Sequence, residues 1–377
     1  MKVSLISEKL QKKILFVNHA ISSKSQLPTL LNFLIEAKEG KITISATDLE
    51  IGIMVDVPAK TENTGSVTVS AKILVELVGM IFSDKISLET TREGLVLKGE
   101  KEETVFQTTP VDEFPKLYED KGKQVMVLNK ETIERDFLRV VFAASPNSER
   151  PALSGVLMRE DRDGFLLVAT DGYRLSLKKH ALQDAKKEKT GETISMLVPA
   201  RVVRELIQME KDVEAEDVKV FVSQEKNQII FSQNDTTLIG RLIESEFPNY
   251  EKIIPTDFST KTVFERNSLQ KAIKAGYVFA RQTAGIIKLA IEKGKILVSA
   301  NAPSVGKNLI EVEAKTTGEE NEIAFNARYL LDFLSNSTSE TLSFEMTGPL
   351  NPGVFREIDD PSFMHLIMPI RVQQESA

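Results

Sequence analysis

A threefold internal repeat is the feature that most constrains how this chain can fold. Three strand-like runs, KITI, FLLV and KILV, are each followed by a related segment: ISATDLE from residue 44, VATDGYRLS from residue 168 and VSANAPS from residue 298. Their key residues Asp48, Asp171 and Asn301 stand 123 and 130 positions apart. This regular spacing predicts three equivalent domains of about 125 residues each.

A second signature recurs in the same order. The segments AKILVELV, ARVVRELI and ARYLLDFL begin at Ala71, Ala200 and Ala327. In each, a base follows the alanine and an acid comes four residues after the base, so the two side chains are neighbours on one helical face. The pattern predicts a helix at the same place in every repeat.

A third signature predicts another helix ahead of each strand pair. Apolar residues recur at relative positions 0, 4, 7 and 11, which is the buried stripe of an amphipathic helix. Ser7, Asn129 and Asn267 or Ser268 are the expected N-caps. The three stripes are Leu10, Ile14, Val17, Ile21; Ile133, Phe137, Val140, Ala144; and Leu269, Ile273, Gly276, Ala280.

Between the helices, segments such as KITISATDLEIGIMVDV and VKVFVSQEKNQIIFSQ alternate with period two, as half-buried antiparallel strands do. FPKLYEDKGK and FPNYEKIIPT close the first two units alike. We therefore expect an α+β chain of three tandem domains, 1–122, 123–254 and 255–377, each with two helices and antiparallel sheet. Similar modules packed head to tail form a ring if the rotation from each module to the next adds up to a full turn.

Composition excludes several classes of function. The chain has no cysteine, so it has no disulfide, thiolate metal site or cysteine nucleophile. Its net charge of −7 argues against a broad nucleic-acid coat but allows a basic stripe. The three histidines, His19, His180 and His365, lack ligand spacing, and no Walker-type loop is present, so we expect no metal and no cofactor. Charges break every apolar run near the N-terminus, so no signal peptide or membrane span is expected.

The order and spacing of ATDLE, ATDGYRLS, FNARYLLDFL and the C-terminal MPIRV make the whole chain resemble the bacterial DNA polymerase III β sliding clamp family. The resemblance implies the clamp fold and a homodimer in which two chains pair head to tail, so that six domains encircle duplex DNA. It implies a non-enzymatic processivity factor in the bacterial cytoplasm, nucleoid-associated during replication. Expected partners are duplex DNA bound without sequence preference, the replicative polymerase, the clamp loader and other proteins with short clamp-binding motifs.

The segment TDGYR has three interpretations. A catalytic one lacks a neighbouring base or nucleophile. A structural one is a strand-end turn in which Asp171 accepts backbone N–H bonds and Gly172 takes positive φ. The family resemblance adds a hydrophobic groove that binds partner peptides. Its matching residues are Leu153, Thr170, Gly172, Tyr173, Arg174, Leu175, Pro248, Ile253, Tyr329, Leu350, Leu366, Met368, Pro369, Ile370 and Arg371.

Leu153, Ile253 and Leu366 are equally compatible with plain core positions. Tyr173, Pro352 and Ile370 depart from residues common in the family, which should alter partner preference and not the existence of the groove. The effect of the C-terminal QQESA on the groove stays open.

The resemblance also assigns DNA contacts and a dimer interface. Lys24 and Arg150 match the inner edge of the ring, and the expected inner helices carry Lys12, Lys72, Arg201 and Lys274. For the four helix bases the alternative, favoured for each taken singly, is an ordinary solvated side chain, and Lys24 and Arg150 rank above them as DNA contacts. Phe106, Val278 and Phe279 match interface positions, with burial inside their own domains as the alternative.

Two rival functions remain at this stage. One is a triple-repeat scaffold that binds peptides without encircling DNA, which the mass in solution would distinguish. The other is a hydrolase or transferase built on Asp171 and Arg174, which the absence of a nearby base disfavours.

Overall fold

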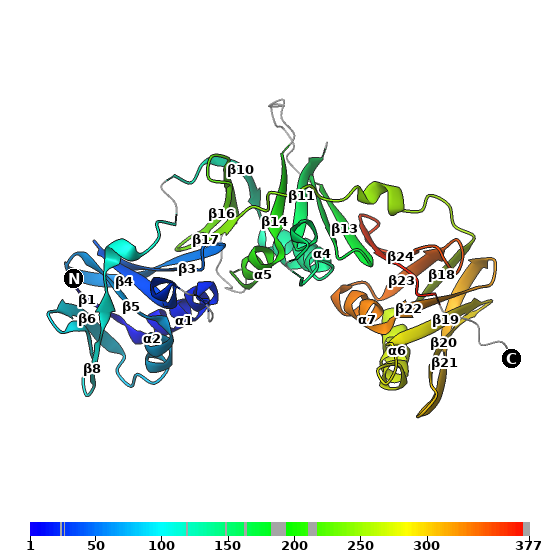
Figure 1. The fold of residues 1–377 in the computed structure, drawn as a ribbon, viewed down its shortest axis with the longest axis horizontal. Coiled ribbons are helices and arrows are strands. Elements are labelled where there is room, and N and C mark those ends of the chain that lie inside the picture. Colours follow the sequence, from blue (N-terminus) through cyan, green and yellow to red (C-terminus); the bar gives the residue numbers. More distant parts are fainter. Residues whose placement is uncertain are drawn as a thin grey trace. The chain divides into compact units, whose positions relative to one another are not determined.

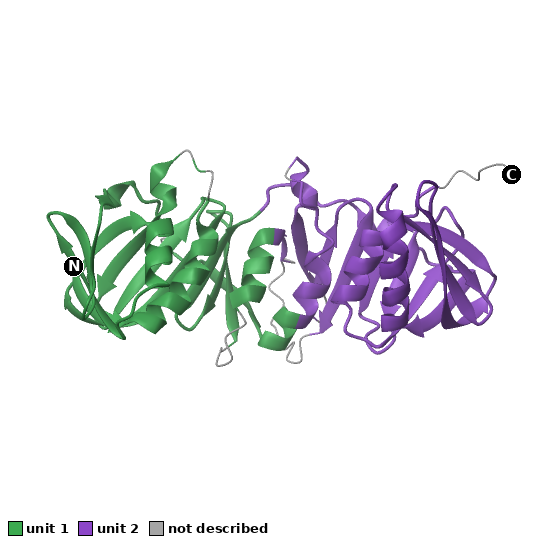
Figure 2. Cartoon of the chain, turned by 90° about the horizontal axis from the view of Figure 1, so that it is seen from below, with its two compact units in different colours: residues 1–134, 201–242 green, residues 135–200, 243–377 purple. Residues whose placement is uncertain are grey.

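The strands assemble into two continuous antiparallel sheets, and each sheet belongs to one unit of the chain (Figure 2). The computed structural model describes residues 1–22, 25, 27–117, 120–147, 149–161, 164–181, 194–209 and 217–371. Unit 1 comprises 1–134 with 201–242, and unit 2 comprises 135–200 with 243–377. The middle of the chain therefore contributes to both units.

Unit 1 holds a sheet of 13 strands, ordered β10-β15-β16-β17-β4-β1-β6-β7-β8, with β2, β3, β5 and β9 branching from it. Strand β17 pairs with β4, placing Leu238 opposite Ile53, and we call this pairing the first join. The strands are β1 Lys2–Ile6, β2 Asn32–Lys38, β3 Lys41–Thr47, β4 Ile51–Asn63, β5 Gly65–Ser70, β6 Lys85–Thr91, β7 Gly94–Lys98, β8 Glu103–Phe106, β9 Thr108–Thr109, β10 Lys123–Leu128, β15 Val218–Ser223, β16 Gln228–Gln233 and β17 Thr236–Arg241.

Unit 2 holds a sheet of 12 strands in the order β14-β11-β12-β13-β25-β24-β23-β18-β21-β20-β19-β22. Strand β25 pairs with β13, placing His365 opposite Ser176, and this is the second join. The strands are β11 Gly155–Asp161, β12 Gly164–Thr170, β13 Arg174–Ala181, β14 Ser195–Pro199, β18 Thr260–Glu265, β19 Ile286–Glu292, β20 Lys295–Ala302, β21 Gly306–Gly318, β22 Asn321–Asn326, β23 Thr341–Met346, β24 Gly353–Glu357 and β25 Phe363–Ile367.

The helices begin where the repeats predict (Figure 1). Three of them, α2, α5 and α7, start at Ala71, Ala200 and Ala327, and α6 packs beside α7. The α-helices are α1 Ser7–Val17, α2 Ala71–Val78, α3 Lys130–Thr132, α4 Leu138–Val141, α5 Ala200–Met209, α6 Arg266–Ala280 and α7 Ala327–Asn336. A π-helical turn, Ile133–Phe137, joins α3 to α4, and short 3₁₀ turns cover Asn18–Ala20, Pro28–Leu31, Val111–Glu113, Pro151–Leu153 and Tyr250–Ile253.

The predicted apolar stripes are confirmed. All four residues of the second and third stripes are buried, and in the first only Ile21 is partly exposed. Two of the expected caps are wrong. Ser7 is the first residue of α1 and its hydroxyl donates to Ser83 O, while α6 is capped by Glu265, which accepts from the Asn267 and Ser268 amides. Asn129 does cap α3, accepting from Thr132 N.

Residues with positive φ turn two of the hairpins. Gly40 turns β2 into β3 with φ of 75°, and Asn227 turns β15 into β16 with φ of 51°. Within the described ranges, no helix is long and apolar enough to cross a membrane. The predicted domain boundaries stay a prediction, because the two joins connect strands across them.

Candidate functional site

The TDGYR segment forms the turn between β12 and β13. Asp171 Oδ1 accepts from the amides of Tyr173 at 2.9 Å and Arg174 at 3.0 Å. Thr170 Oγ1 donates to Arg174 O at 2.6 Å and accepts from Gly172 N at 3.0 Å. Gly172 adopts φ of 91°, a region that residues with a Cβ rarely adopt. The structural role predicted for Asp171 is confirmed.

The first repeat builds the same turn with a leucine in place of the glycine. Asp48 Oδ1 accepts from Glu50 N and Ile51 N at 3.1 and 2.9 Å, and Leu49 takes φ of 79°. The third repeat does not build it. Asn301 lies within β20 opposite Lys307, because this hairpin turns later, beyond Ala302. The equivalence of Asn301 to Asp48 and Asp171 in the sequence repeat therefore does not extend to the turn.

The Arg174 side chain is 8% exposed and fully engaged inside unit 2. Its Nε donates to Asp171 Oδ2 at 3.0 Å, Nη1 to Asp332 Oδ2 at 2.5 Å, and Nη2 to Phe142 O at 3.0 Å. Its guanidinium carbon lies 4.6 Å from the Tyr329 ring centroid and 5.6 Å from that of Phe142. Arg174 therefore ties the turn to α7 and to the end of α4.

At the first join, the corresponding carboxylate and carbonyl oxygen are also bound by one arginine, but this arginine comes from a different position in the repeat. Arg201, at the start of α5, donates to Asp48 Oδ2 and to His19 O, which correspond to Asp171 and to Phe142 O. The acid that follows Arg201, Glu205, pairs with His19 Nδ1 at 2.7 Å. These bases and acids therefore find their partners on other elements and not within their own helix.

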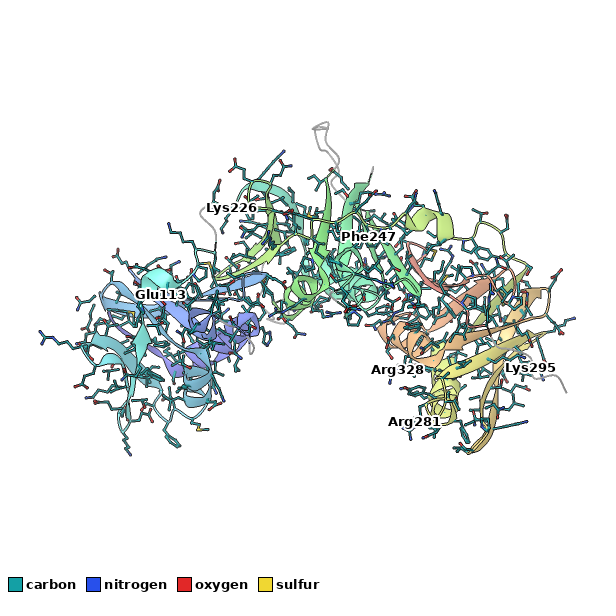
Figure 3. The ribbon with its side chains drawn as sticks, viewed as in Figure 1. Glu113, Lys226, Phe247, Arg281, Lys295 and Arg328 are labelled. Atoms are coloured by element: carbon teal, nitrogen blue, oxygen red, sulfur yellow. The ribbon has the colours of Figure 1, made fainter. Side chains whose placement is uncertain are left out.

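Arg328 is the repeat equivalent of Arg201, yet its role differs because Arg174 already neutralises Asp171. It is exposed on the first turn of α7, where Nε donates to Tyr277 Oη at 2.9 Å (Figure 3).

The C-terminal segment lies against the TDGYR turn. Met368 N donates to Tyr173 O at 2.8 Å, and Ile370 N donates to Ala324 O at 2.8 Å. A Cβ placed on Gly172 would lie 3.9 Å from Leu153 Cδ1 and 4.0 Å from Arg150 Nη1. Segments far apart in sequence are thus brought together within unit 2.

The predicted peptide-binding residues all belong to unit 2 but differ in exposure. Leu175 and Leu366 are fully buried in an apolar cluster with Tyr250, so they support the surface from beneath. Leu153, Thr170 and Arg174 are also buried, whereas Tyr329, Met368, Pro369 and Ile370 are half-buried. The exposed members are Gly172, Tyr173, Pro248, Ile253, Leu350 and Arg371.

Sequence reasoning missed three residues next to this surface, of which Asp332 has a side chain that is 46% exposed. Asp332 was visible only as the acid of the ARYLLD pattern, and Phe142 only as an apolar residue between Val140 and Ala144 of the second stripe. His365 is completely buried, stacks on Phe333 with centroids 5.1 Å apart, and shares a 2.7 Å hydrogen bond with Ser176. Burial, reinforced by the Arg174 charge, holds the pKa of His365 well below its ordinary value, so His365 is neutral.

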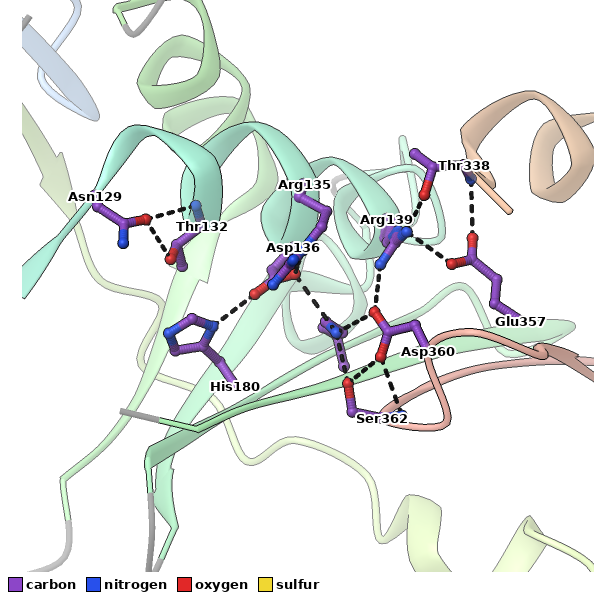
Figure 4. Close-up of polar contacts among 11 residues, drawn as sticks. Asn129, Thr132, Arg135, Asp136, Arg139, His180, Thr338, Glu357, Asp360 and Ser362 are labelled. Atoms are coloured by element: carbon purple, nitrogen blue, oxygen red, sulfur yellow. Dashed lines mark hydrogen bonds and ion pairs between the residues drawn. The ribbon is translucent and has the colours of Figure 1, made fainter. Parts of the chain in front are cut away.

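A network of buried charges lies nearby in unit 2 (Figure 4). Lys178 Nζ donates to Asp360 Oδ2 at 2.6 Å and to Ser362 Oγ at 2.5 Å, and Arg139 pairs with Glu357 and Asp360 at 2.7 and 2.6 Å. Burial tends to raise the pKa of Asp360, but the bonds from Lys178 and Ser362 hold it below its ordinary value. For Glu357, burial outweighs Arg139 and raises the pKa.

The predicted DNA contacts have different surroundings. Lys24 and the segment QQESA lie outside the described residues. Lys72, Arg150 and Lys274 are exposed, and Lys12 pairs with Glu8 one helical turn away at 3.0 Å. Arg201 is held by Asp48 and His19 O, as described above. In the described part of the chain, no group of three or more His, Asp and Glu could hold a metal ion.

The predicted interface residues also differ. Phe106 is 5% exposed in β8, so it packs within its own unit, whereas Val278 is 51% exposed. Phe279 is half-buried and packs against the core beneath α6.

The fold and site define a repeat protein in which antiparallel sheets carry helices and an apolar surface spans two repeats. Family profiles of the DNA polymerase III beta subunit match the chain in order: N-terminal domain at 1–118, central domain at 127–249 and C-terminal domain at 251–371. The chain belongs to the DNA polymerase III beta subunit family, and its three domains are clamp domains.

Individual relatives agree along the whole length. The beta sliding clamp of Synechococcus elongatus is 27% identical, with 99% of this chain and 100% of that protein covered. The crystal structures of the DNA polymerase beta subunit from Streptococcus pyogenes and of the DNA polymerase III beta subunit from Thermotoga maritima are each 26% identical, and each covers 99% of this chain and 100% of its own. Their TM-scores are 0.92 and 0.90.

Proposed function

We propose that the chain is a sliding clamp. Two copies pair head to tail into a ring that encircles duplex DNA and tethers the replicative polymerase, giving it processivity. As an accessory subunit, the clamp catalyses no reaction itself. It acts in the bacterial cytoplasm, in association with the nucleoid during replication. The functional repeats are 1–122, 123–254 and 255–377, so the dimer contains six clamp domains.

The observation that carries this proposal is an inter-repeat strand pairing used twice in one chain. In the first join the last strand of the second repeat, β17, pairs with β4 of the first. In the second join the last strand of the third repeat, β25, pairs with β13 of the second. The first and third repeats each have one equivalent strand that takes part in neither join. Strand β8 is the equivalent of β17 and β25, and strand β21 is the equivalent of β4 and β13.

Both remaining strands have an unpaired edge. Among the described strands β8 pairs only with β7, and the segment of β21 from Gly306 to Glu313 pairs only with β20. Unpaired edges are templates for another strand. Carrying the register of the two joins over to the third places Val105 opposite Leu309. Both side chains are exposed, at 42% and 66%, and both are apolar, so pairing would bury them together.

One chain carries one edge of each kind, in its first and third repeats. Two copies therefore satisfy all four edges of this kind if the rotation closes, and none of these four remains to extend a filament. A closed ring holds DNA by topology. It needs only weak attraction to phosphates, which the exposed Lys12, Lys72, Lys274 and Arg150 would supply, with Lys24 as a further candidate.

The apolar surface around the TDGYR turn is the proposed docking groove for short motifs of the polymerase, the clamp loader and other partners. Tyr173, Ile253 and Leu350 offer exposed apolar area, Met368 lines it with an adaptable side chain, and Ile370 adds a branched apolar one. Arg174 supports this surface without pointing to solvent.

The absence of cysteine makes the ring directly testable. In a Val105→Cys, Leu309→Cys chain, opposed strand positions suit disulfide geometry, and oxidation should close both contacts of the dimer. The oxidised protein should migrate as a dimer and stay on nicked circular DNA in high salt, but leave once the DNA is cut to a linear form.

A chain carrying Val105→Cys with Ile358→Cys, where Ile358 is a similarly exposed residue of unit 2, is the matched control and should not cross-link. A wild-type monomer at micromolar concentration would instead favour the peptide-binding scaffold that does not encircle DNA.

A further inference from the structure

Asp332 carries a charge close to the apolar surface around the TDGYR turn, although it is not one of the residues that line that surface. It lies in the middle of α7, and its side chain is 46% exposed. Its Oδ2 accepts from Arg174 Nη1 at 2.5 Å, while only its backbone oxygen bonds within the helix, to Asn336 Nδ2 at 2.8 Å. The carboxylate therefore serves the contact with Arg174 and not the helix that carries it.

The charges that meet at Arg174 do not balance. Asp171 accepts from Nε at 3.0 Å and Asp332 from Nη1, so two carboxylates share one guanidinium and the cluster keeps one net negative charge. The Asp171 side chain is only 10% exposed, so water screens this charge incompletely. Arg328, one helical turn before Asp332, is exposed to solvent and donates to Tyr277 Oη on α6 instead. Its charge is therefore screened and directed elsewhere.

The field of this cluster reaches the apolar surface at Tyr329. This side chain is half-buried, and its ring centroid lies 4.6 Å from the guanidinium carbon of Arg174. The pKa of Tyr329 lies above its ordinary value, mainly because of burial. The Asp171 charge raises this pKa more than Arg174 lowers it, and Asp332 acts in the same direction as Asp171. The surroundings of Tyr329 are therefore unfavourable for an anion.

Exposed cations lie at another part of the same surface. Arg150 is exposed, and its Nη1 would lie 4.0 Å from a Cβ placed on Gly172. Arg371, directly after Ile370, is exposed as well. The surface is therefore basic beside the TDGYR turn and negative beside Tyr329, so the effect of an acidic residue in a bound peptide depends on where that residue lies.

We propose that Asp332 is a specificity-determining residue of the docking groove, whose carboxylate masks the charge of Arg174 and disfavours peptides with an acidic residue next to Tyr329. Asp332 acts through Arg174 and does not have to touch the peptide. Specificity of this kind comes from a repulsive element against the wrong ligand. The inference rests on the groove of the proposed function and adds the class of peptide that it accepts, namely apolar anchors with a neutral or basic residue beside Tyr329.

Asp332→Asn tests the inference, because the amide keeps an oxygen that accepts from Arg174 and loses only the charge. The affinity of the full chain is measured by fluorescence polarisation for end-blocked synthetic peptides with a Leu-Phe pair as apolar anchor. Every other position of the peptide is in turn Glu or Gln. The wild type should prefer Gln to Glu several-fold for at least one position, and Asp332→Asn should reduce that ratio about threefold or more. The urea unfolding midpoint should stay that of the wild type, which separates specificity from stability.

Two further variants are the controls. Asp332→Glu keeps the charge and should keep the preference for Gln. Glu292→Gln removes a carboxylate of 36% exposure that pairs with Lys295 in the β19–β20 hairpin, and it should leave every ratio unchanged.

The outcomes separate the inference from the function on which it rests. A wild type without any preference for Gln, an Asp332→Asn chain with unchanged ratios, or an equal reduction in Glu292→Gln would overturn the role of Asp332 and leave the groove intact. A wild type that binds none of the peptides would overturn the groove, and the role of Asp332 with it.

Discussion

Arg174 Nη1 donates to Asp332 Oδ2 at 2.5 Å, and this contact joins the strand-end turn of the middle repeat to the second helix of the last. The corresponding turn in unit 1 is joined to α5 through Arg201 and Asp48. In both places the carboxylate of a half-buried aspartate and a helix-end carbonyl need one guanidinium between them. The chain supplies it from the turn in one case and from the facing helix in the other.

Replacing Arg174 by lysine should lower the free energy of unfolding by about 2 kcal/mol, because one ammonium cannot satisfy Asp171, Asp332 and Phe142 O together. Urea unfolding followed by circular dichroism measures this. Arg328→Lys is the matched control, because Arg328 is exposed, and its unfolding midpoint should not move. Equal losses in the two variants would contradict the structural role of Arg174.

Leu49→Gly should stabilise unit 1 by about 0.5–1 kcal/mol, because φ of 79° is unfavourable for a residue with a Cβ. The reciprocal change Gly172→Ala should destabilise unit 2 by about 1 kcal/mol, since its φ is 91° and surrounding atoms leave enough space for the methyl group. Thermal unfolding of both variants beside the wild type tests the pair. Shifts of the same sign would show that backbone strain is not the determining factor.

Lys72 and Arg201 occupy equivalent positions but should respond differently to substitution. Lys72→Ala should weaken DNA binding without changing the free energy of unfolding. The slope of the logarithm of the binding constant against the logarithm of the salt concentration should become shallower by about one. Arg201→Ala should instead destabilise unit 1 by about 2 kcal/mol, because Asp48 and His19 O lose their partner. Filter binding over a salt series and urea unfolding separate these effects. A salt slope unchanged by Lys72→Ala would remove that residue from the DNA surface.

Asp360 should stabilise unit 2 in a pH-dependent way. Its folded pKa lies below the ordinary 3.8, so its contribution is complete above that pH and is lost as the pH falls through the folded value. Asp360→Asn should cost about 2 kcal/mol at pH 7, and the difference from wild type should shrink below pH 3.8.

Glu357→Gln is the comparison for Asp360→Asn. Burial raises the pKa of Glu357, so ionisation at neutral pH already works against folding, and the amide should cost less than Asp360→Asn at pH 7. Urea unfolding of both variants from pH 3 to pH 7 tests the order. A larger loss of unfolding free energy for Glu357→Gln than for Asp360→Asn at pH 7 would contradict the opposite pKa directions given to these two carboxyl groups.

Local sequence patterns were sufficient to predict where the helices of each repeat lie. The apolar stripes located the first helix of each repeat, and the alanine-led segments located the start of each second helix. Both signals depend on neighbours three or four residues apart, which a helix brings together whatever surrounds it. The Asp171 turn was predictable for the same reason, because its hydrogen bonds span no more than four residues.

Caps were less predictable. Glu265 and not Asn267 or Ser268 caps α6, since the helix starts at Arg266, two or three residues earlier than either of those caps would place it. Asn301 was misplaced because the longer hairpin keeps it inside β20.

Sequence by itself determined the threefold repeat, the positions of the helices and the strand-end turn of TDGYR. Only the tertiary structure decided that Arg174 is buried between two carboxylates, that Arg201 neutralises Asp48, and that Phe82 is exposed while Phe106 is not. The reason is physical. Repeats and turns are set by residues close in the chain, whereas the partner of a charge and the burial of a ring depend on which distant strands pair, and no short-range pattern records that pairing.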